Sequence, residues 1–136
     1  MAAIGRINFD ARKLGAVGDQ GAMKVLIKKG FQLANDIKLS MKDSGPAGKR
    51  GATREERAAN RSKPGEPPHV DTGRLRASIQ VNWMGGGETG QDAPPQPSEP
   101  FTVRVGTNVE YAYGLEFGTS KVAPRPFLRP ALDRLR

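Results

Sequence analysis

His69 is the only histidine of the chain, so it is the first residue to test for acid–base or metal chemistry. It lies in a proline-rich stretch between Glu66 and Asp71, which make a weak ligand set for a metal ion. A triad of Ser78, His69 and Asp71 can be written down, but no pattern places the serine on a strained turn or supplies an oxyanion hole. The pattern favours a structural or solvent-exposed histidine. We therefore expect no metal, no cofactor and no enzymatic activity.

Two further patterns could bind phosphate or transfer protons. The run from Gly85 to Gly87 follows a predicted strand, as phosphate-binding loops do, but it lacks their Gly-Lys-Ser/Thr ending and a following helix. Glu110 and Glu116 could form a carboxylate pair, but on a helix this spacing places them on different faces. We expect these carboxylates instead to accept hydrogen bonds from backbone amides, or from an arginine of the same or a neighbouring chain.

Aromatic residues gather toward the C-terminal end. Tyr111, Tyr113 and Phe117 lie in one short, turn-rich segment, and Phe127 follows shortly after. Aromatic side chains bury large areas, so in a chain with 6% aromatic residues such a cluster indicates either a core or an assembly surface. The sequence leaves both interpretations open.

The composition suits one domain of 136 residues, in which 17 glycines and 11 prolines predict much loop. The net charge of +8 favours contact with acidic surfaces or phosphate backbones, although a solvated surface explains it equally well. The chain has no cysteine, which excludes disulfides and thiolate metal sites. No run is apolar enough for a membrane span, and the N-terminal residues lack the apolar stretch of a signal peptide.

The spacing of apolar residues predicts the elements that would position these groups. A long helix is expected from Gln20 to Lys42, with Asp19 as its N-cap and Ser44-Gly45-Pro46 as its stop. A capped turn at Asp71 or Thr72 and a short helical piece should follow.

Alternating residues predict strands at 78–83 and 101–106, which we expect to pair antiparallel. A short helix or turn over 111–117 should end at Gly118, and a terminal helix should run from Pro130 to Leu135. The predicted order is helix, loop, strand, strand, short helix, helix. The fold class is therefore α+β, with a long N-terminal helix on a small antiparallel sheet, a short C-terminal helix and long loops.

Two segments of this single domain, residues 1–136, look less regular. A flexible basic arm is expected at about 44–70, with a short helix from Thr53 to Asn60 because Thr53 and Glu56 fit a capping box. The loop from Gly85 to Pro100 is long, so we expect it to reach outward or to be disordered. The residues expected to contact DNA or an acidic partner are Lys49, Arg50, Arg54, Arg57, Arg61 and Lys63.

Two ordered sets of short motifs resemble a known family. The first, Pro64-Gly65-Glu66-Pro67-Pro68, continues into Asp71-Thr72-Gly73-Arg74-Leu75 and Ser78-Ile79. The second, Tyr111-Ala112 and Glu116-Phe117-Gly118-Thr119, continues into Pro126-Phe127-Leu128-Arg129-Pro130-Ala131. Together with the long helix, they are similar to the small head-tail joining or tail-completion (neck) proteins of long-tailed bacteriophages and prophages.

The resemblance implies a structural virion protein, assembled in the bacterial host cytoplasm, that forms a homo-oligomeric ring at the head-tail junction. A hexamer is favoured over a dodecamer. The ring would lie between a connector or stopper protein and the tail tube protein, would complete the tail and would let DNA pass, with possible DNA contact in its lumen and no membrane. The alternative is a non-specific DNA-binding protein that uses the basic arm. The motif residues expected to build the assembly are Asp71, Thr72, Gly73, Leu75, Tyr111, Tyr113, Glu116, Phe117, Gly118, Thr119, Pro126, Phe127 and Pro130.

Overall fold

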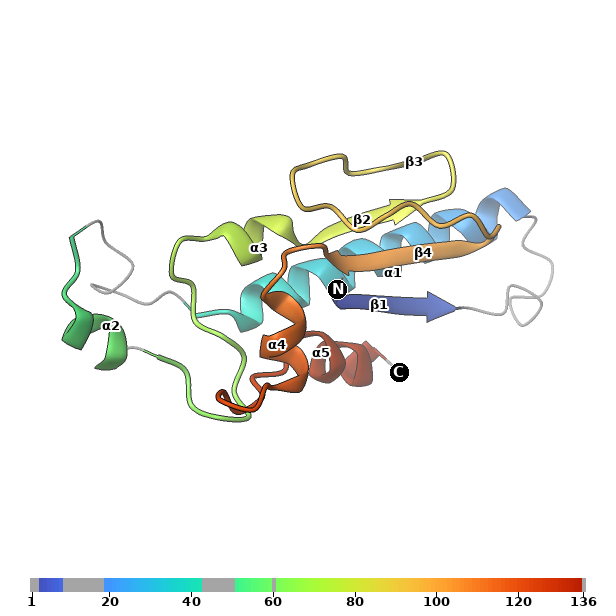
Figure 1. The fold of residues 1–136 in the computed structure, drawn as a ribbon. Coiled ribbons are helices and arrows are strands. Elements are labelled where there is room, and N and C mark those ends of the chain that lie inside the picture. Colours follow the sequence, from blue (N-terminus) through green and yellow to red (C-terminus); the bar gives the residue numbers. More distant parts are fainter. Residues whose placement is uncertain (1–2, 9–18, 43–50, 60, 136) are drawn as a thin grey trace.

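The structure, a computed structural model, describes residues 3–8, 19–42, 51–59 and 61–135 (Figure 1). It combines a long helix, a small antiparallel sheet and short C-terminal helices, which confirms the predicted α+β class. In chain order the elements are β1 (Ala3–Asn8), α1 (Asp19–Ser40), α2 (Arg54–Ala59), α3 (Arg74–Ser78), β2 (Gln80–Trp83), β3 (Gly86–Gly87), β4 (Thr102–Thr107), α4 (Ala112–Phe117) and α5 (Leu128–Leu135).

The sheet has the strand order β1-β4-β2-β3, and each neighbouring pair is antiparallel. β4 is central, because Val105 pairs with Val81 on one side and with Gly5 on the other. The pairing of β2 with β4 confirms the predicted antiparallel pair.

β1 is absent from the elements that the sequence pattern predicts. Its two isoleucines, Ile4 and Ile7, are three residues apart, which does not fit the two-residue period of a half-buried strand. Its six residues form a strand through pairing with β4, from Ala3 opposite Thr107 to Asn8 opposite Thr102. A contact so distant in sequence leaves no local signal.

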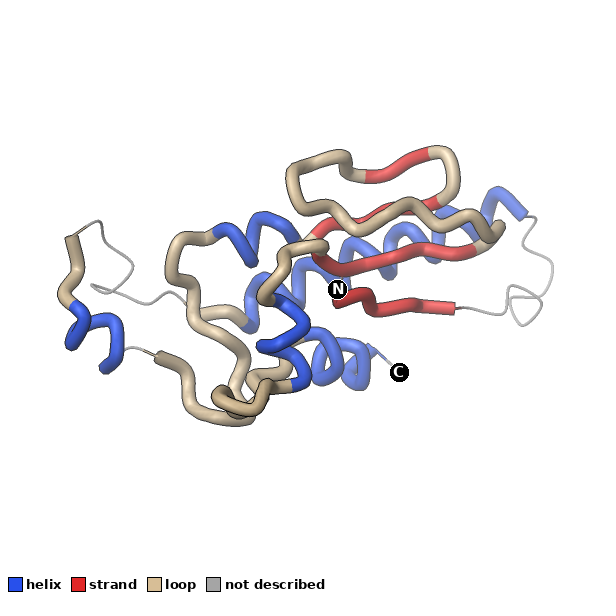
Figure 2. The backbone as a smooth tube through the Cα atoms, viewed as in Figure 1, coloured by secondary structure: helices blue, strands red, loops and turns tan. Residues whose placement is uncertain are grey.

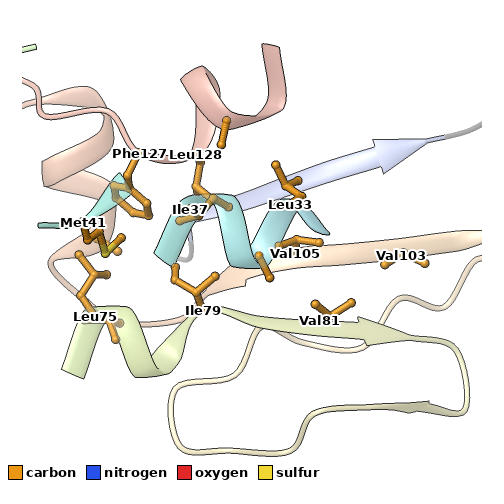
Figure 3. Close-up of a cluster of buried hydrophobic side chains, with 14 of the residues drawn as sticks. Leu33, Ile37, Met41, Leu75, Ile79, Val81, Val103, Val105, Phe127 and Leu128 are labelled. Atoms are coloured by element: carbon orange, nitrogen blue, oxygen red, sulfur yellow. The ribbon is translucent and has the colours of Figure 1, made fainter. Parts of the chain in front are cut away.

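One face of the sheet packs against α1. Leu33 and Ile37 on the helix are fully buried, as are Val81, Val103 and Val105 on the strands (Figure 3). These strand residues share a face because side chains alternate along a strand. The apolar spacing that predicts the long helix, and the alternation that predicts both strands, thus correspond to side chains buried in the core. The predicted stop at 44–46 lies outside the described residues.

The opposite face of the sheet is polar, and the loop from 85 to 100 folds back over it. Gln80 Oε1 accepts a hydrogen bond from Gly90 N at 3.0 Å, and Asn82 donates its side-chain amide to Pro94 O. Arg104 Nη1 donates to Pro95 O at 3.1 Å and to Gln96 O at 3.3 Å. The loop therefore lies against the sheet and does not reach outward, because polar strand residues offer partners to its backbone carbonyls and amides.

The basic arm contains the short helix that the capping box predicts. Thr53 N donates to Glu56 Oε2 at 2.8 Å, and Glu56 N donates to Thr53 Oγ1 at 3.2 Å, so both halves of the box form at the start of α2. α2 has no buried residue and stands apart from the sheet (Figure 1). From its end an extended segment runs beside the turn that follows α4 and then back to α3 (Figure 2).

The helix starts agree only in part with the prediction. Thr72 Oγ1 accepts a 3.4 Å hydrogen bond from Arg74 N, as expected for the turn before α3, but the N-cap residue of α3 is Gly73 and the helix has no side-chain cap. α5 starts at Leu128, two residues before the predicted Pro130. The earlier start has a tertiary cause, a carboxylate from α4.

Candidate assembly interface

Glu116 joins α4 to the first turn of α5. Its side chain is 1% exposed, and its carboxylate accepts three backbone N–H groups: Phe127 and Leu128 at 2.8 and 3.0 Å on Oε2, and Arg129 at 3.0 Å on Oε1. The first N–H groups of a helix have no partner within the helix and favour negative charge. Glu116 therefore caps α5 from another element, as expected from the sequence for a carboxylate of this segment.

Arg129 completes this contact from the surface. Its Nε donates to Glu116 Oε1 at 3.2 Å, and its Nη2 donates to Glu116 O at 3.0 Å. Its guanidinium also lies over the ring of Phe117, 4.7 Å from the centroid, which is a cation–π contact. We call Glu116 and Arg129 the clasp, because together they fix α4 against α5.

Tyr113 and Phe117 form an exposed aromatic pair on the clasp. Their ring centroids are 4.8 Å apart, and the side chains are 42% and 49% exposed. They lie four residues apart on α4 and so share one face of the helix. Since aromatic side chains are enriched at protein interfaces, this pair is the strongest candidate for a docking surface.

The structure divides the aromatic cluster of the sequence. Phe127 is 1% exposed and belongs to the core, whereas the aromatic pair faces outward. Tyr111 precedes α4 and lines a separate cleft with Leu115. Both interpretations of the cluster therefore hold for part of it: Phe127 lies in the core, and Phe117 lies on the surface.

Gly118 ends α4 with φ of 80°, a backbone conformation that a side chain would strain. The chain then turns: Thr119 N donates to Val122 O at 2.8 Å, and Thr119 Oγ1 accepts from Val122 N at 3.1 Å. After this turn, Arg125 N donates a hydrogen bond to Leu115 O at 2.6 Å. Hence Gly118 and Thr119, both expected as motif residues, shape the path that brings Phe127 back to Glu116. Pro126 and Pro130 are partly buried along this path.

The two motif segments meet in space. Gly65 N donates to Pro124 O at 2.9 Å, and Arg125 Nε donates to Ser62 O at 3.0 Å. The extended stretch after α2 is therefore held against the turn that precedes α5. Residues some sixty positions apart in the sequence build one region of the molecule.

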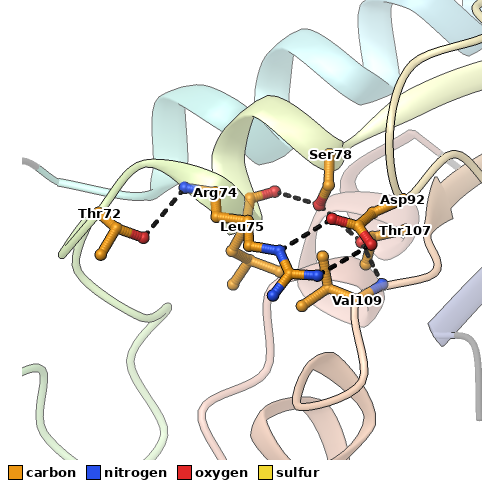
Figure 4. A network of polar contacts seen from close by, with 7 residues as sticks. All are labelled: Thr72, Arg74, Leu75, Ser78, Asp92, Thr107 and Val109. Atoms are coloured by element: carbon orange, nitrogen blue, oxygen red, sulfur yellow. Dashed lines mark hydrogen bonds and ion pairs between the residues drawn. The ribbon is translucent and has the colours of Figure 1, made fainter.

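A polar network supports the other motif residues (Figure 4). Arg74 binds Asp92 through two hydrogen bonds, Nε to Oδ2 at 2.9 Å and Nη2 to Oδ1 at 3.0 Å. These bonds to Arg74 lower the pKa of the Asp92 carboxyl below its usual value. Partial burial raises the pKa of the Tyr111 phenol, and the nearby Arg74 charge opposes that shift. Arg74 thus anchors the 85–100 loop to α3.

Ser78, the serine of the triad considered above, makes hydrogen bonds that link two elements of the fold. The Ser78 hydroxyl is buried, donates to Leu75 O at 2.7 Å and lies 2.6 Å from the Thr107 hydroxyl. Thr107 Oγ1 in turn accepts from Val109 N at 3.0 Å. This serine therefore joins α3 to β4.

The remaining expected residues divide between cleft, core and surface. Asp71, Thr72 and Gly73 line the cleft, and Leu75 lies between the cleft and the core. Of the basic residues, Arg57 and Arg61 line the cleft, Arg54 and Lys63 are exposed elsewhere, and Lys49 and Arg50 lie outside the described residues.

The sequence did not single out Arg74, Asp92 or Arg129 as structural partners. No spacing rule links Arg129 to Glu116 or Arg74 to Asp92, because each pair joins different elements. Over the described ranges, no group of three histidine or acidic side chains could hold a metal ion. No helix in the described part of the chain has the length and apolar character needed to cross a membrane.

Comparison with known proteins gives one family. Residues 10–118 match the model described as "Bacteriophage HK97-gp10, putative tail-component". This range includes α1 to α4, with Glu116 and the aromatic pair. Among curated proteins there is no match, and there is none among solved structures.

Proposed function

Because the chain belongs to the HK97 gp10-like family of phage tail components, we propose that it is a structural protein of the phage neck that forms a ring at the head-tail junction. Membership of the family makes the chain a phage structural component. Beyond family membership, we propose that the protein forms a ring, that the ring lies in the neck, and that DNA passes through it. In this proposal the ring completes the tail between a connector or stopper protein and the tail tube protein.

The observation that carries the proposal is the exposed aromatic pair on the clasp. Tyr113 and Phe117 are held at fixed positions, because Glu116 and Arg129 bind α4 to α5 through five hydrogen bonds in total. A surface that is ordered before binding loses less conformational entropy when a partner docks. Exposed aromatic side chains on a rigid support are typical anchors of protein interfaces.

The edge of the sheet offers a second docking surface. β1 pairs with β4, and no strand of the described ranges pairs with its other edge. An open strand edge presents unpaired backbone N–H and C=O groups to another chain. Two different docking surfaces on one protomer suit a head-to-tail contact, which closes into a ring when the rotation permits. A hexamer is the copy number that we favour.

The test is the oligomeric state of the purified protein, alone and with its tail tube and connector proteins. Mass measurement and negative-stain images should give a closed ring. The double variant Tyr113→Ala/Phe117→Ala should stay folded by circular dichroism but lose the ring. The matched control is Leu39→Ala, which removes an exposed apolar side chain from α1 and should keep the ring.

A folding comparator separates assembly from stability. Phe127→Ala removes a buried ring and should lower the free energy of unfolding by about 3–5 kcal/mol. The proposal fails if the double variant still forms rings, or if the native protein remains monomeric with both partner proteins present.

Non-specific DNA binding is the second candidate, and the exposed basic arm favours it. Arg54 and Lys63 are exposed, and α2, which carries Arg54, stands apart from the sheet (Figure 1). Binding through phosphates would weaken steeply as salt increases. A gel-shift assay with duplex DNA at low salt tests this candidate, and absence of binding would eliminate it.

A further inference from the structure

A cleft of about 650 Å³ lies between the end of the basic arm, the start of α3 and the start of α4. We propose that it receives an extended acidic segment of another protein chain, with carboxylates beside an apolar side chain. The inference rests on the proposed function in one respect, since the segment would belong to a neighbouring virion protein. The arginines that line the cleft are Arg57, Arg61, Arg74, Arg76 and Arg125, against a single carboxylate, Asp71.

Two of the cleft arginines, Arg57 and Arg61, carry charge that no carboxylate of the described residues neutralises. Arg74, by contrast, is bound by Asp92. Arginine presents a planar fork of donors that matches a carboxylate with two parallel hydrogen bonds. A carboxylate entering the cleft could therefore accept hydrogen bonds from the guanidinium groups of Arg57 and Arg61.

The apolar part of the lining selects the class of ligand. Met41, Leu75 and Leu115 line the cleft beside the arginines, with Tyr111. A nucleic acid backbone offers phosphates but no aliphatic side chain for these residues. A cavity of this volume, in the range of about 300–1,000 Å³ typical of small-ligand sites, also accommodates a few side chains and not a duplex. Both features favour a peptide segment over DNA.

The position of the cleft suits a docking partner. Tyr111 and Leu115 belong to the motif segment that also carries the aromatic pair, and Arg125 is held by Ser62 O. The cleft therefore opens between the two segments that the family resemblance singles out. A segment bound there would contact both segments at once.

The experiment measures binding of a short fluorescein-labelled peptide of alternating glutamate and leucine to the full chain by fluorescence anisotropy. The native protein should bind this peptide, and should bind a lysine-and-leucine peptide at least about tenfold more weakly, because like charges repel. The double variant Arg57→Glu/Arg61→Glu should weaken binding of the acidic peptide by about tenfold or more.

The control is Arg54→Glu, which makes the same charge change on α2 outside the cleft. It should weaken binding by less than the double variant does, at most about threefold, because Arg54 does not line the cleft and pairwise interactions between exposed charges are weak. Because α2 has no buried residue and Arg61, which follows it, is exposed, the variants should keep the melting temperature of the native protein. The inference is overturned if the native protein does not bind the acidic peptide, if it binds the lysine peptide equally well, or if the double variant binds like the native protein.

Duplex DNA is the competing ligand. If duplex DNA binds the native protein and loses that affinity in Arg57→Glu/Arg61→Glu but not in Arg54→Glu, the cleft is a phosphate site and the inference is wrong. The peptide assay and the ring assay give separate answers. A ring without peptide binding contradicts this inference alone, whereas peptide binding without a ring contradicts the neck ring alone.

Discussion

Glu116 shows how one buried side chain can determine the relation between two helices. Its carboxylate replaces the side-chain caps that α5 lacks and accepts the N–H groups of Phe127, Leu128 and Arg129. Burial of a charge is costly unless hydrogen bonds compensate it. Here they do, and the same carboxylate also binds Arg129.

Replacing Glu116 tests this role. In Glu116→Gln the amide NH2 would face backbone donors, so at least one N–H group would lose its acceptor. We expect the free energy of unfolding to fall by about 2–4 kcal/mol, measured by urea denaturation. Glu110→Gln is the control, because Glu110 is exposed, and its effect should stay within about 0.5 kcal/mol. Equal effects of the two changes would contradict the cap.

The ion pair of Asp92 with Arg74 should make the stability of the fold depend on pH. Its pKa in the folded protein is lowered by Arg74, so the unfolded chain binds more protons in the acid range. The ion pair therefore stabilises the fold above the unfolded pKa of about 4, and this stabilisation disappears as the pH falls through the lower, folded value.

Comparison of the native protein with Asp92→Asn should show the effect. Asparagine tolerates the positive φ of 62° at this position, so the backbone need not change. Denaturant titrations should give a stability difference at neutral pH that vanishes in strong acid. Glu99→Gln, an exposed carboxylate of the same loop, should give no such pH dependence. A difference that persists unchanged in acid would exclude the ion pair as its source.

At the scale of the elements, α1 lies so close to the sheet that Gly30 has no room for a side chain. A Cβ there would lie 2.8 Å from Val103 Cγ1 and 3.0 Å from Val81 Cγ1. Both valines are β-branched, fully buried and stiff, so they cannot move aside without cost. Gly30 thus belongs to the packing of the helix on the strands.

Gly30→Ala should therefore destabilise the protein. A helix propensity gain of about 1 kcal/mol opposes an overpacking cost of about 1–3 kcal/mol, so we expect a net loss of up to about 2 kcal/mol in thermal or urea unfolding. Asn35→Ala, an exposed change on the same helix, should be neutral or slightly stabilising. A more stable Gly30→Ala protein would show that α1 is less closely packed.

Hydrogen bonds attach the basic arm to the rest of the molecule at the turn before α5 and at the end of α1. Arg125 Nε holds Ser62 O, Gly65 N donates to Pro124 O, and Val70 N donates to Lys42 O at 2.8 Å. These bonds tie the segment after α2 to the turn before α5 and to the end of α1. Apart from Pro68 and Val70, few apolar side chains of this segment are buried, so its part nearer α2 should open independently of the core.

Arg125→Ala should loosen the arm without unfolding the core. The Gly65 amide should exchange its hydrogen about tenfold faster, which corresponds to about 1.4 kcal/mol of local stability, while core amides such as Val105 stay protected. Hydrogen exchange measured by NMR gives both values at once. Lys121→Ala, an exposed change in the same turn, should leave the Gly65 amide unchanged. Faster exchange throughout the core would mean that the arm and the core unfold together.

Elements with local signals could be recognised from the amino-acid sequence alone. The stripe on α1, the alternation on β2 and β4, the capping box at Thr53 and the glycine after α4 each act within a few residues, so each could be recognised without the fold. The ordered motifs also sufficed to indicate the phage family, which the family match supports. The suggestion that Glu116 accepts backbone N–H groups was likewise correct.

Features that depend on residues distant in sequence became visible only in the folded chain. β1 forms because β4 lies beside it, α5 begins at Leu128 because Glu116 caps it, and the 85–100 loop is ordered by Gln80, Asn82 and Arg104. The aromatic cluster divided in the same way, with Phe127 buried and Phe117 exposed. Hydrophobicity is the same for both phenylalanines; their roles differ because the turn at Gly118 directs the chain back, so that one ring enters the core and the other remains on the surface.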